Sequence, residues 1–334
     1  MIRLAVDMHG GDHGPAVVLS AALNFVEHYS DVHLCLFGDT RQVAAWQPTF
    51  AQYQNRVTWC HGQHYPQHES SLRQLLNAPE PDDALAMALR SAVSGSANED
   101  TCAAIVTAAD TRTLMIRARQ CLGYREGVKR PALGAWIPGY TGPVLALDVG
   151  ASVVADADDM LQSALMGHRF LKAHQYERTP RIGLLNIGHE AHKASQRLAA
   201  AHALFGQQDA LDYRGYVEPR AVFANEVDMV ITDGFTGNVM LKSMEATADY
   251  IKHRVFDVLT ERWYGRMLGL LTARLFASDF ASVNAERHNG APLLGVNGWV
   301  VKSHGNAKAV AFGQALQQAR HAVRLGVPER MWVE

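Results

Sequence analysis

The sequence lacks the features that mark several large classes of protein. Its four cysteines are scattered, without the Cys-x-x-Cys spacing of a zinc site or a redox pair. No apolar run reaches the roughly 18 residues that a membrane-spanning helix needs, and the N-terminus shows no secretory signal. The net charge is only -2, which gives no reason to expect a nucleic-acid partner. We therefore expect a protein of the reducing cytoplasm.

The standard fingerprints of nucleotide-binding and hydrolytic enzymes are also missing. The chain has no G-x-G-x-x-G, G-x-x-x-x-G-K-[S/T] or G-x-S-x-G motif, and no histidine is followed five positions later by aspartate. These absences argue against Rossmann dehydrogenases, P-loop NTPases, serine hydrolases and the acyltransferases that acylate glycerol phosphate. His9 and His13 lie close together, but no second cluster of ligand side chains completes a metal site with them. We expect no metal.

What the chain does contain is a long alternation of apolar strands and amphipathic helices. With 334 residues, of which 48% are hydrophobic and 19% charged, it can bury a large core. Short continuous apolar runs, typical of strands buried on both faces of a parallel sheet, occur at 2–6, 33–37, 56–60, 102–106, 144–148, 181–186 and 228–232. Helices are expected from Pro15, over 156–173 and over 190–205. The pattern predicts a single α/β domain over residues 1–334 with a doubly wound, mostly parallel sheet.

Two segments depart from this alternation. Asn297-Gly298 lies between the apolar runs 293–296 and 299–302, which predicts a two-residue hairpin and an antiparallel part of the sheet. Residues 245–285 show helical spacing without a strand, which predicts a helical hairpin protruding from the domain. The segment 79–83 predicts an exposed acidic loop.

A glycine-bearing polar loop follows many of the strands, and each such loop leads toward an expected helix. These loops lie at 7–15, 148–152, 186–190, 233–238 and 302–306. Glycine lets backbone N–H groups approach an anion, and a helix N-terminus adds the positive end of its dipole. Because open α/β sheets bind ligands at the carboxyl ends of their strands, the pattern predicts phosphate or a phosphorylated substrate.

The last loop offers the most varied chemistry. Lys302, Ser303 and His304 place an ammonium, a hydroxyl and an imidazole before a helix start, and phosphate oxygens bind such donors. An ordinary helix cap with exposed neighbours is the alternative. Two other patterns have simple structural interpretations: a tight turn for Gly10-Gly11, and a solvated ion pair for Glu190 and Lys193.

Read together, these motifs resemble the bacterial phosphate acyltransferase family of phospholipid synthesis. The opening resembles the family's D-x-M-G-G-D-x-x-P motif, and the match continues in order over nearly the whole chain. The matching segments are Asp7 to Pro15, Arg130 to Leu133, Leu147 to Ala151, Gly183 to Gly188, Thr232 to Asn238, Gly290 to Gly295 and Lys302 to Gly305.

The resemblance implies an enzyme that makes acyl phosphate from acyl carrier protein and inorganic phosphate. It also implies a sheet like that of phosphotransacetylases and isopropylmalate dehydrogenases, a homodimer, no organic cofactor, and a helical hairpin that contacts the partner subunit or the inner face of the membrane near a glycerol-phosphate acyltransferase. We expect His304, Lys302, Lys193 and Asp12 to be catalytic, with His304 protonating the leaving thiolate. The expected substrate-binding and phosphate-binding residues are Gly10, Gly11, Thr111, Asn186, Asp233, Gly234, Asn238, Ser303 and Gly305.

Four departures from the family pattern keep other functions open. The S-x-G-N-T-G loop of the family is here Thr107 to Arg112, with Asp110 in place of asparagine and both glycines lost. An acidic segment at 79–83 replaces a basic run, Ser152 replaces an asparagine, and Ala194-Ser195 replaces Gly-Asn. Arg112 is a candidate to offset Asp110. The rival functions are a phosphotransacetylase-like enzyme that uses acyl coenzyme A, and an impaired relative that serves as a binding scaffold.

Overall fold

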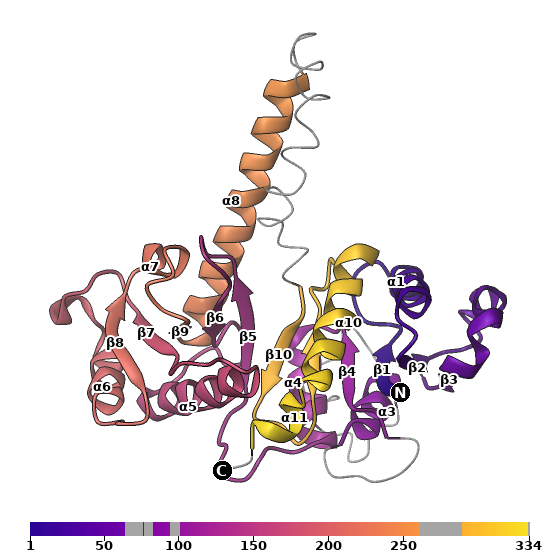
Figure 1. Cartoon of the computed structure of the whole chain (residues 1–334), viewed down its shortest axis with the longest axis horizontal. Helices are drawn as coiled ribbons and strands as arrows, with labels where there is room; N and C mark the ends of the chain where they lie inside the picture. Colours follow the sequence, from indigo (N-terminus) through magenta and orange to yellow (C-terminus); the bar gives the residue numbers. More distant parts are fainter. Residues whose placement is uncertain (64–75, 77–82, 94–100, 261–288, 333–334) are drawn as a thin grey trace.

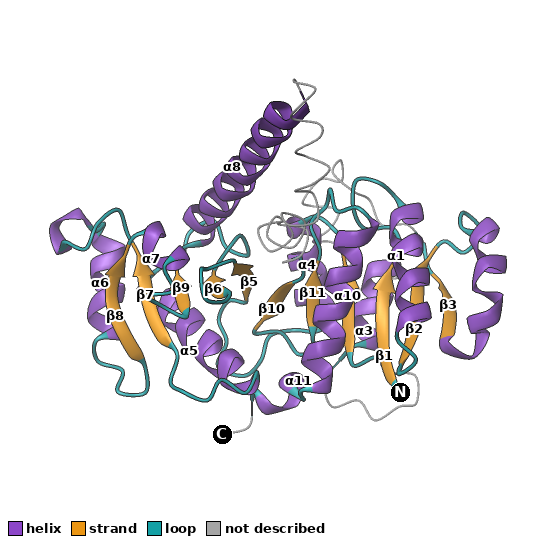
Figure 2. Cartoon of the chain, turned by 45° about the horizontal axis from the view of Figure 1, so that its top comes forward, coloured by secondary structure: helices purple, strands orange, loops and turns teal. Residues whose placement is uncertain are grey.

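The protein is built around one long sheet with helices on both faces. A computed structural model describes residues 1–63, 76, 83–93, 101–260 and 289–332. The strands are β1 (Ile2–Asp7), β2 (Val32–Gly38), β3 (Val57–His61), β4 (Ala104–Thr107), β5 (Ala132–Ile137), β6 (Val144–Leu147), β7 (Arg181–Leu185), β8 (Asp212–Val217), β9 (Met229–Ile231), β10 (Ala291–Leu294) and β11 (Val300–Lys302). They form an 11-stranded sheet in the order β3-β2-β1-β4-β11-β10-β5-β6-β9-β7-β8, and Figure 2 shows them side by side across the molecule.

The helices connect these strands and cover the sheet. They are α1 (Pro15–His28), α3 (Ala84–Ser91), α4 (Thr111–Cys121), α5 (Ala157–Ala173), α6 (Gln196–Phe205), α7 (Pro219–Phe223), α8 (Gly234–Thr260), α10 (Ala309–Arg324) and α11 (Val327–Arg330), with 3-10 turns η1 (Ala44–Arg56) and η2 (Ala191–Lys193). Alternate strand residues enter different clusters: Leu4 and Val6 pack with α1 and α10, whereas Ala5 packs with α3. This double-sided burial explains the continuous apolar runs of the strands.

The sheet consists of two parallel blocks that point in opposite directions. The strands β3, β2, β1, β4 and β11 are mutually parallel, and so are β6, β9, β7 and β8. Between the blocks, the pairs β11·β10, β10·β5 and β5·β6 are all antiparallel. The carboxyl ends of the two blocks therefore lie at opposite edges of the sheet.

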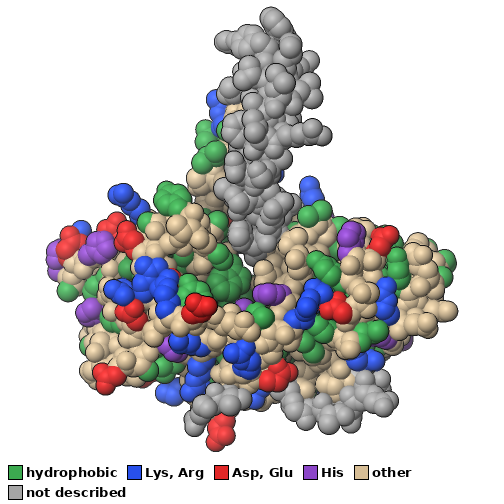
Figure 3. Space-filling model, in the orientation of Figure 1, with side chains coloured by type: hydrophobic (Ala, Val, Ile, Leu, Met, Phe, Trp, Pro, Cys, Tyr) green, Lys and Arg blue, Asp and Glu red, His purple; other side chains and the backbone are tan. Residues whose placement is uncertain are grey.

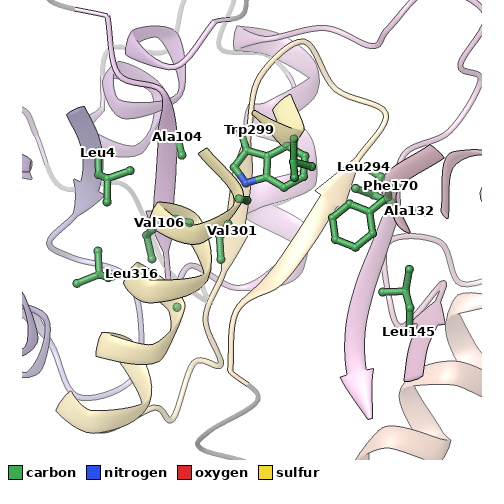
Figure 4. Packing of buried hydrophobic residues seen from close by; sticks show 14 of the residues in the cluster. Leu4, Ala104, Val106, Ala132, Leu145, Phe170, Leu294, Trp299, Val301 and Leu316 are labelled. Atoms are coloured by element: carbon green, nitrogen blue, oxygen red, sulfur yellow. The ribbon is translucent and has the colours of Figure 1, made fainter. Parts of the chain in front are cut away.

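A single apolar cluster crosses the junction between the blocks. Figure 4 shows Val301 and Trp299 of the first block facing Leu294, Phe170 and Leu145 across the junction. The rings of Phe170 and Trp299 stack with their centroids 5.9 Å apart. The junction is thus held by packed side chains as well as by strand pairing.

Two helix boundaries differ from the sequence expectation. The helix expected from residue 190 begins at Gln196, because Ser195 caps it by accepting the Leu198 N–H at 3.3 Å, and only a short 3-10 turn precedes it. The helix expected from Glu245 begins earlier, at Gly234. There the backbone of α8 touches the loop after β6 so closely that a Cβ at Gly234 would collide with Ser152.

The hairpin prediction is correct for the strands and wrong for their connection. Strands β10 and β11 pair antiparallel, with Leu293 opposite Val300. The connection is longer than two residues, because Gly295, at φ +95°, ends β10. Asn297 does not form a free turn; its amide donates to the carbonyl oxygens of Leu122 and Tyr124.

Helix α8 protrudes from the sheet as a long arm (Figure 1). The structure does not describe residues 261–288, so the rest of the expected hairpin, from 261 to 285, lies outside the described residues. The acidic residues 79–82 lie outside them as well. Within the described part of the chain, none of the helices combines the length and the apolar character needed to cross a membrane.

Candidate active site

A cavity of about 530 Å³ lies between the base of α8 and the junction of the two sheet blocks. We call it the central cavity. Its polar lining consists chiefly of Thr111, Asn238, Lys242, Glu245, Lys302, Ser303 and His304, and its apolar lining includes Leu133, Trp136, Ile137, Phe223, Leu241, Met244 and Ile251. Hydrophobic side chains are also seen on the surface below α8 in the middle of the molecule (Figure 3). The cavity thus joins a charged region to an apolar region.

The loop after β11 forms the charged wall of the central cavity. It holds its shape because Asn289, which is fully buried, binds it from inside. The Asn289 amide donates to Ser303 Oγ at 2.7 Å and to the Ala311 carbonyl at 2.8 Å, while its Oδ1 accepts the His304 N–H at 3.0 Å. Ser303 is itself fully buried.

Lys302 is a cation in a dehydrated position. Burial, reinforced by the neighbouring charge of Lys242, lowers the pKa of Lys302 from 10.5 to about 8. Asp110, Asp12 and Glu245 act in the opposite direction and partly offset this effect on its pKa. Lys302 therefore carries its charge at neutral pH but is close to losing it. Poorly hydrated ammonium groups of this kind attract anions strongly.

His304 faces a carboxylate across the cavity. Its Nε2 lies 3.4 Å from Glu245 Oε1, with both side chains partly buried. Burial lowers the pKa of His304 from its ordinary value, Glu245 raises it, and the charges of Lys302 and Lys242 lower it further. The net result is a lowered pKa, and Glu245 is the group among these that favours the imidazolium.

Of the predicted residues in the loops after β1 and β4, Thr111 lines the central cavity and the glycines do not. Gly10 packs against the Ala108 backbone, and Gly11, at φ +93°, packs against the Gly305 carbonyl. Asp12 donates its N–H to that same carbonyl at 2.8 Å. Within the described residues, the glycine pair thus lets the loops after β1, β4 and β11 contact one another. Asp12 acts on the cavity through Lys302, whose pKa its charge raises.

The loop from Thr107 to Arg112, which differs from the family pattern, is an ordinary helix start in this structure. Asp110 caps α4 by accepting the Thr113 N–H at 3.0 Å. Thr111 then lines the cavity, whereas the side chain of Arg112 is exposed. The hypothesis that Arg112 offsets Asp110 at the phosphate site stays a prediction.

The predicted residues of the second block divide according to their distance along α8. Asp233 accepts the Thr236 N–H at 2.7 Å, so it orders the start of α8, and Gly234 packs against the Ser152 carbonyl. Asn238, one turn further along the helix, lines the central cavity. Asp233 and Gly234 therefore position the helix that carries Asn238.

Asn186 and Lys193 lie apart from the cavity lining as far as the chain is described. Asn186 is buried and donates to the Gly188 carbonyl at 2.9 Å. Lys193 pairs with Glu190 at 2.9 Å on the exposed 3-10 turn. The simpler interpretation of that pair, a solvated ion pair, agrees with this geometry.

Sequence reasoning missed Lys242, Glu245 and Asn289. The first two have a signal in the sequence, because Lys242 follows Asn238 by four residues and Glu245 follows Lys242 by three. Residues at these spacings share one face of α8. Asn289 has no comparable signal, since its function depends on a fold that brings it under the loop after β11.

Comparison with known proteins places this arrangement in context. Residues 2–330 match the family described as fatty acid synthesis protein. Proteins named phosphate acyltransferase from Coxiella burnetii and Hydrogenovibrio crunogenus are 36% and 33% identical to the chain; the first match covers 98% of the chain and 94% of the relative, the second 100% and 97%.

Solved structures of similar fold support the expected fold class. A phosphotransacetylase from Staphylococcus aureus has a TM-score of 0.56 at 13% identity, covering 96% of this chain and 94% of that one. A branched-chain phosphotransacylase from Enterococcus faecalis has a TM-score of 0.59 at 12% identity, covering 97% and 100%. At such identities the likeness concerns the fold.

Proposed function

The chain belongs to the phosphate acyltransferase family, and on this premise we propose that it forms acyl phosphate by transferring an acyl group from acyl carrier protein to inorganic phosphate. The family expected from the sequence motifs is thereby confirmed. The identity of the acyl donor, acyl carrier protein, is the more specific part of the proposal. It follows from the resemblance of the motifs, and its supporting observation is that one cavity joins cations to an apolar region.

The charged wall suits phosphate. Lys302 and Lys242 supply positive charge, and Thr111, Ser303 and the N-terminus of α4 are close by. Phosphate is already an anion at neutral pH, so it needs positioning more than activation. The apolar lining, including Leu133, Ile137 and Phe223, suits the hydrocarbon chain of an acyl thioester.

The reaction proceeds by attack of a phosphate oxygen on the thioester carbonyl carbon. The new carbon–oxygen bond forms, negative charge gathers on the carbonyl oxygen, and Lys302 stabilises that charge. The carbon–sulfur bond then breaks, and the sulfur takes a proton from His304. The products are acyl phosphate and acyl carrier protein with a free thiol.

The test is phosphate-dependent release of free acyl carrier protein by the purified chain. Acyl coenzyme A is the matched donor in parallel reactions. Equal or faster turnover of coenzyme A would replace the proposal with the phosphotransacetylase-like function. Binding of acyl carrier protein without phosphate-dependent loss of thioester would support the scaffold function instead.

The same proposal includes a cytoplasmic homodimer that contacts the membrane peripherally. Phe235, Val239 and Tyr250 are exposed on the protruding helix α8, and exposed apolar side chains of this kind favour an interface. The sequence of the undescribed segment adds aromatic, leucine and arginine residues, which suit an anionic bilayer surface. Replacing Leu268 and Leu271 with Glu should abolish sedimentation with anionic liposomes while leaving the dimer intact; dissociation to monomers would assign the segment to subunit packing.

A further inference from the structure

Helix α8 brings a carboxylate to the proposed proton donor. Glu245 Oε1 lies 3.4 Å from His304 Nε2, and Glu245 Oε2 lies 3.4 Å from Lys242 Nζ. We propose that Glu245 is a positioning residue that orients the His304 imidazole and favours its protonated form, so that His304 can give its proton to the leaving sulfur. The inference rests on the proposed function and adds a residue that the sequence motifs did not single out.

The charges around His304 make Glu245 decisive. From the same helix, Lys242 faces the imidazole with a like charge, and from β11 Lys302 does the same. Asp12 and Asp110, from the loops after β1 and β4, act on Lys302. Burial and both lysines lower the pKa of His304, and Glu245 opposes them. Without Glu245, the remaining influences all act against the imidazolium.

The contact has the geometry of an orienting ion pair. The His304 backbone is fixed by Asn289 at one end of the residue, and Glu245 holds Nε2 at the other. The imidazole is 34% exposed and the carboxylate 22%, so solvent screens this pair less than a surface pair. Because Glu245 faces Nε2, the transferred proton leaves from Nδ1, and the neutral ring that remains keeps its Nε2 proton toward Glu245.

The isosteric variant Glu245→Gln tests this role. It keeps the shape of the side chain and removes its charge. We expect the alkaline limb of the kcat profile to move to lower pH, with kcat at neutral pH reduced about tenfold for each unit by which the pKa of His304 falls. The KM for phosphate should change far less than kcat. The variant Glu245→Asp, which keeps the charge, should restore part of the loss.

The matched control is Asp249→Asn, which removes one exposed carboxylate from the same helix outside the described cavity lining. It should leave the pH profile in place. A pH profile of Glu245→Gln that coincides with the profile of Asp249→Asn overturns the inference.

A second measurement is independent of turnover. Titration of the His304 signal by NMR with histidine labelled at Cε1, identified by its loss in His304→Gln, should give a lower pKa in Glu245→Gln than in the unmodified chain. An unchanged titration refutes the inference. Absence of phosphate-dependent turnover in the unmodified chain would refute the proposed function instead, and the titration would still decide whether Glu245 controls the imidazole.

Discussion

Asn289 supports the loop of the central cavity from inside, and its removal should lower both stability and turnover. The change Asn289→Ala deletes three hydrogen bonds, to Ser303 Oγ, to the Ala311 carbonyl and from the His304 N–H. Ser303 and Ala311 are buried and His304 is partly buried, so these partners lose their contact with Asn289 where water has little access. At about 1 kcal/mol for each lost bond, the free energy of unfolding should fall by about 3 kcal/mol.

The effect on turnover comes from the freed loop. Ser303 and His304 lose the contacts that fix their positions relative to Glu245 and Lys302. Misplacement of a reacting group by about 1 Å can cost on the order of a hundredfold, so we expect kcat to fall by at least tenfold. Urea unfolding and steady-state kinetics measure the two effects separately.

Asn297→Ala provides the matched control. Asn297 lies in the same hairpin and donates two hydrogen bonds to backbone, to Leu122 at 3.2 Å and to Tyr124 at 2.9 Å, but it is outside the described cavity lining. It should cost about 2 kcal/mol of stability and leave kcat unchanged. Equal losses of kcat in both variants would show that general destabilisation causes the effect, and the reasoning about Asn289 would fail.

Three further predictions follow from single residues. His304→Ala should lower turnover by about 10²-fold or more as the proton donor is lost; a folded variant with unchanged turnover removes His304 from the mechanism. Because the pKa of Lys302 is about 8, its ammonium loses charge as pH rises through that value, so the KM for phosphate should rise there in the unmodified chain and be insensitive in Lys302→Met; a flat KM in the unmodified chain contradicts this. Burial of Asp228 opposes its ionisation, but hydrogen bonds from Arg181 and Arg178 prevail and lower its pKa from 3.8 to about 2. Its contribution to stability is therefore present above the ordinary pKa and lost as pH falls toward 2, and Asp228→Asn should cost about 3 kcal/mol at neutral pH; equal acid unfolding of the variant and the unmodified chain would count against it.

The sequence predicted seven strands directly and two more in the hairpin, and it missed β5 and β8. All seven predicted strands are present within a residue or two of their expected ends. Strand β8 lies at the edge of the sheet and contains Asp212, Arg214 and Gly215, so it has no continuous apolar run. Strand β5 is rich in small residues, and Gly134 is tightly packed between Pro292 and Leu145. Its sequence reflects close packing more than strand propensity.

The site was predictable where it depends on one loop and not where it depends on strand direction. Lys302, Ser303 and His304 lie together because they are neighbours in the chain. The sequence predicted a mostly parallel sheet with one antiparallel part, and it did not indicate that the strands on the two sides of that part run in opposite directions. The three antiparallel pairs in the middle reverse the second block, which sends Asn186 to the opposite edge. Asn238 reaches the cavity because α8 crosses back toward it.

Helix α8 also has a mechanical consequence. It is one continuous helix of 27 residues, or about 40 Å at 1.5 Å per residue, and its base is clamped by glycine contacts at Gly234 and Gly237. A tilt of about 5° around that base moves the outer end by about 3 Å and Glu245 by about 1 Å. The gap of 3.4 Å between Glu245 and His304 is sensitive to a change of that size. The length of α8 therefore means that any tilt at its base would change the distance between Glu245 and His304.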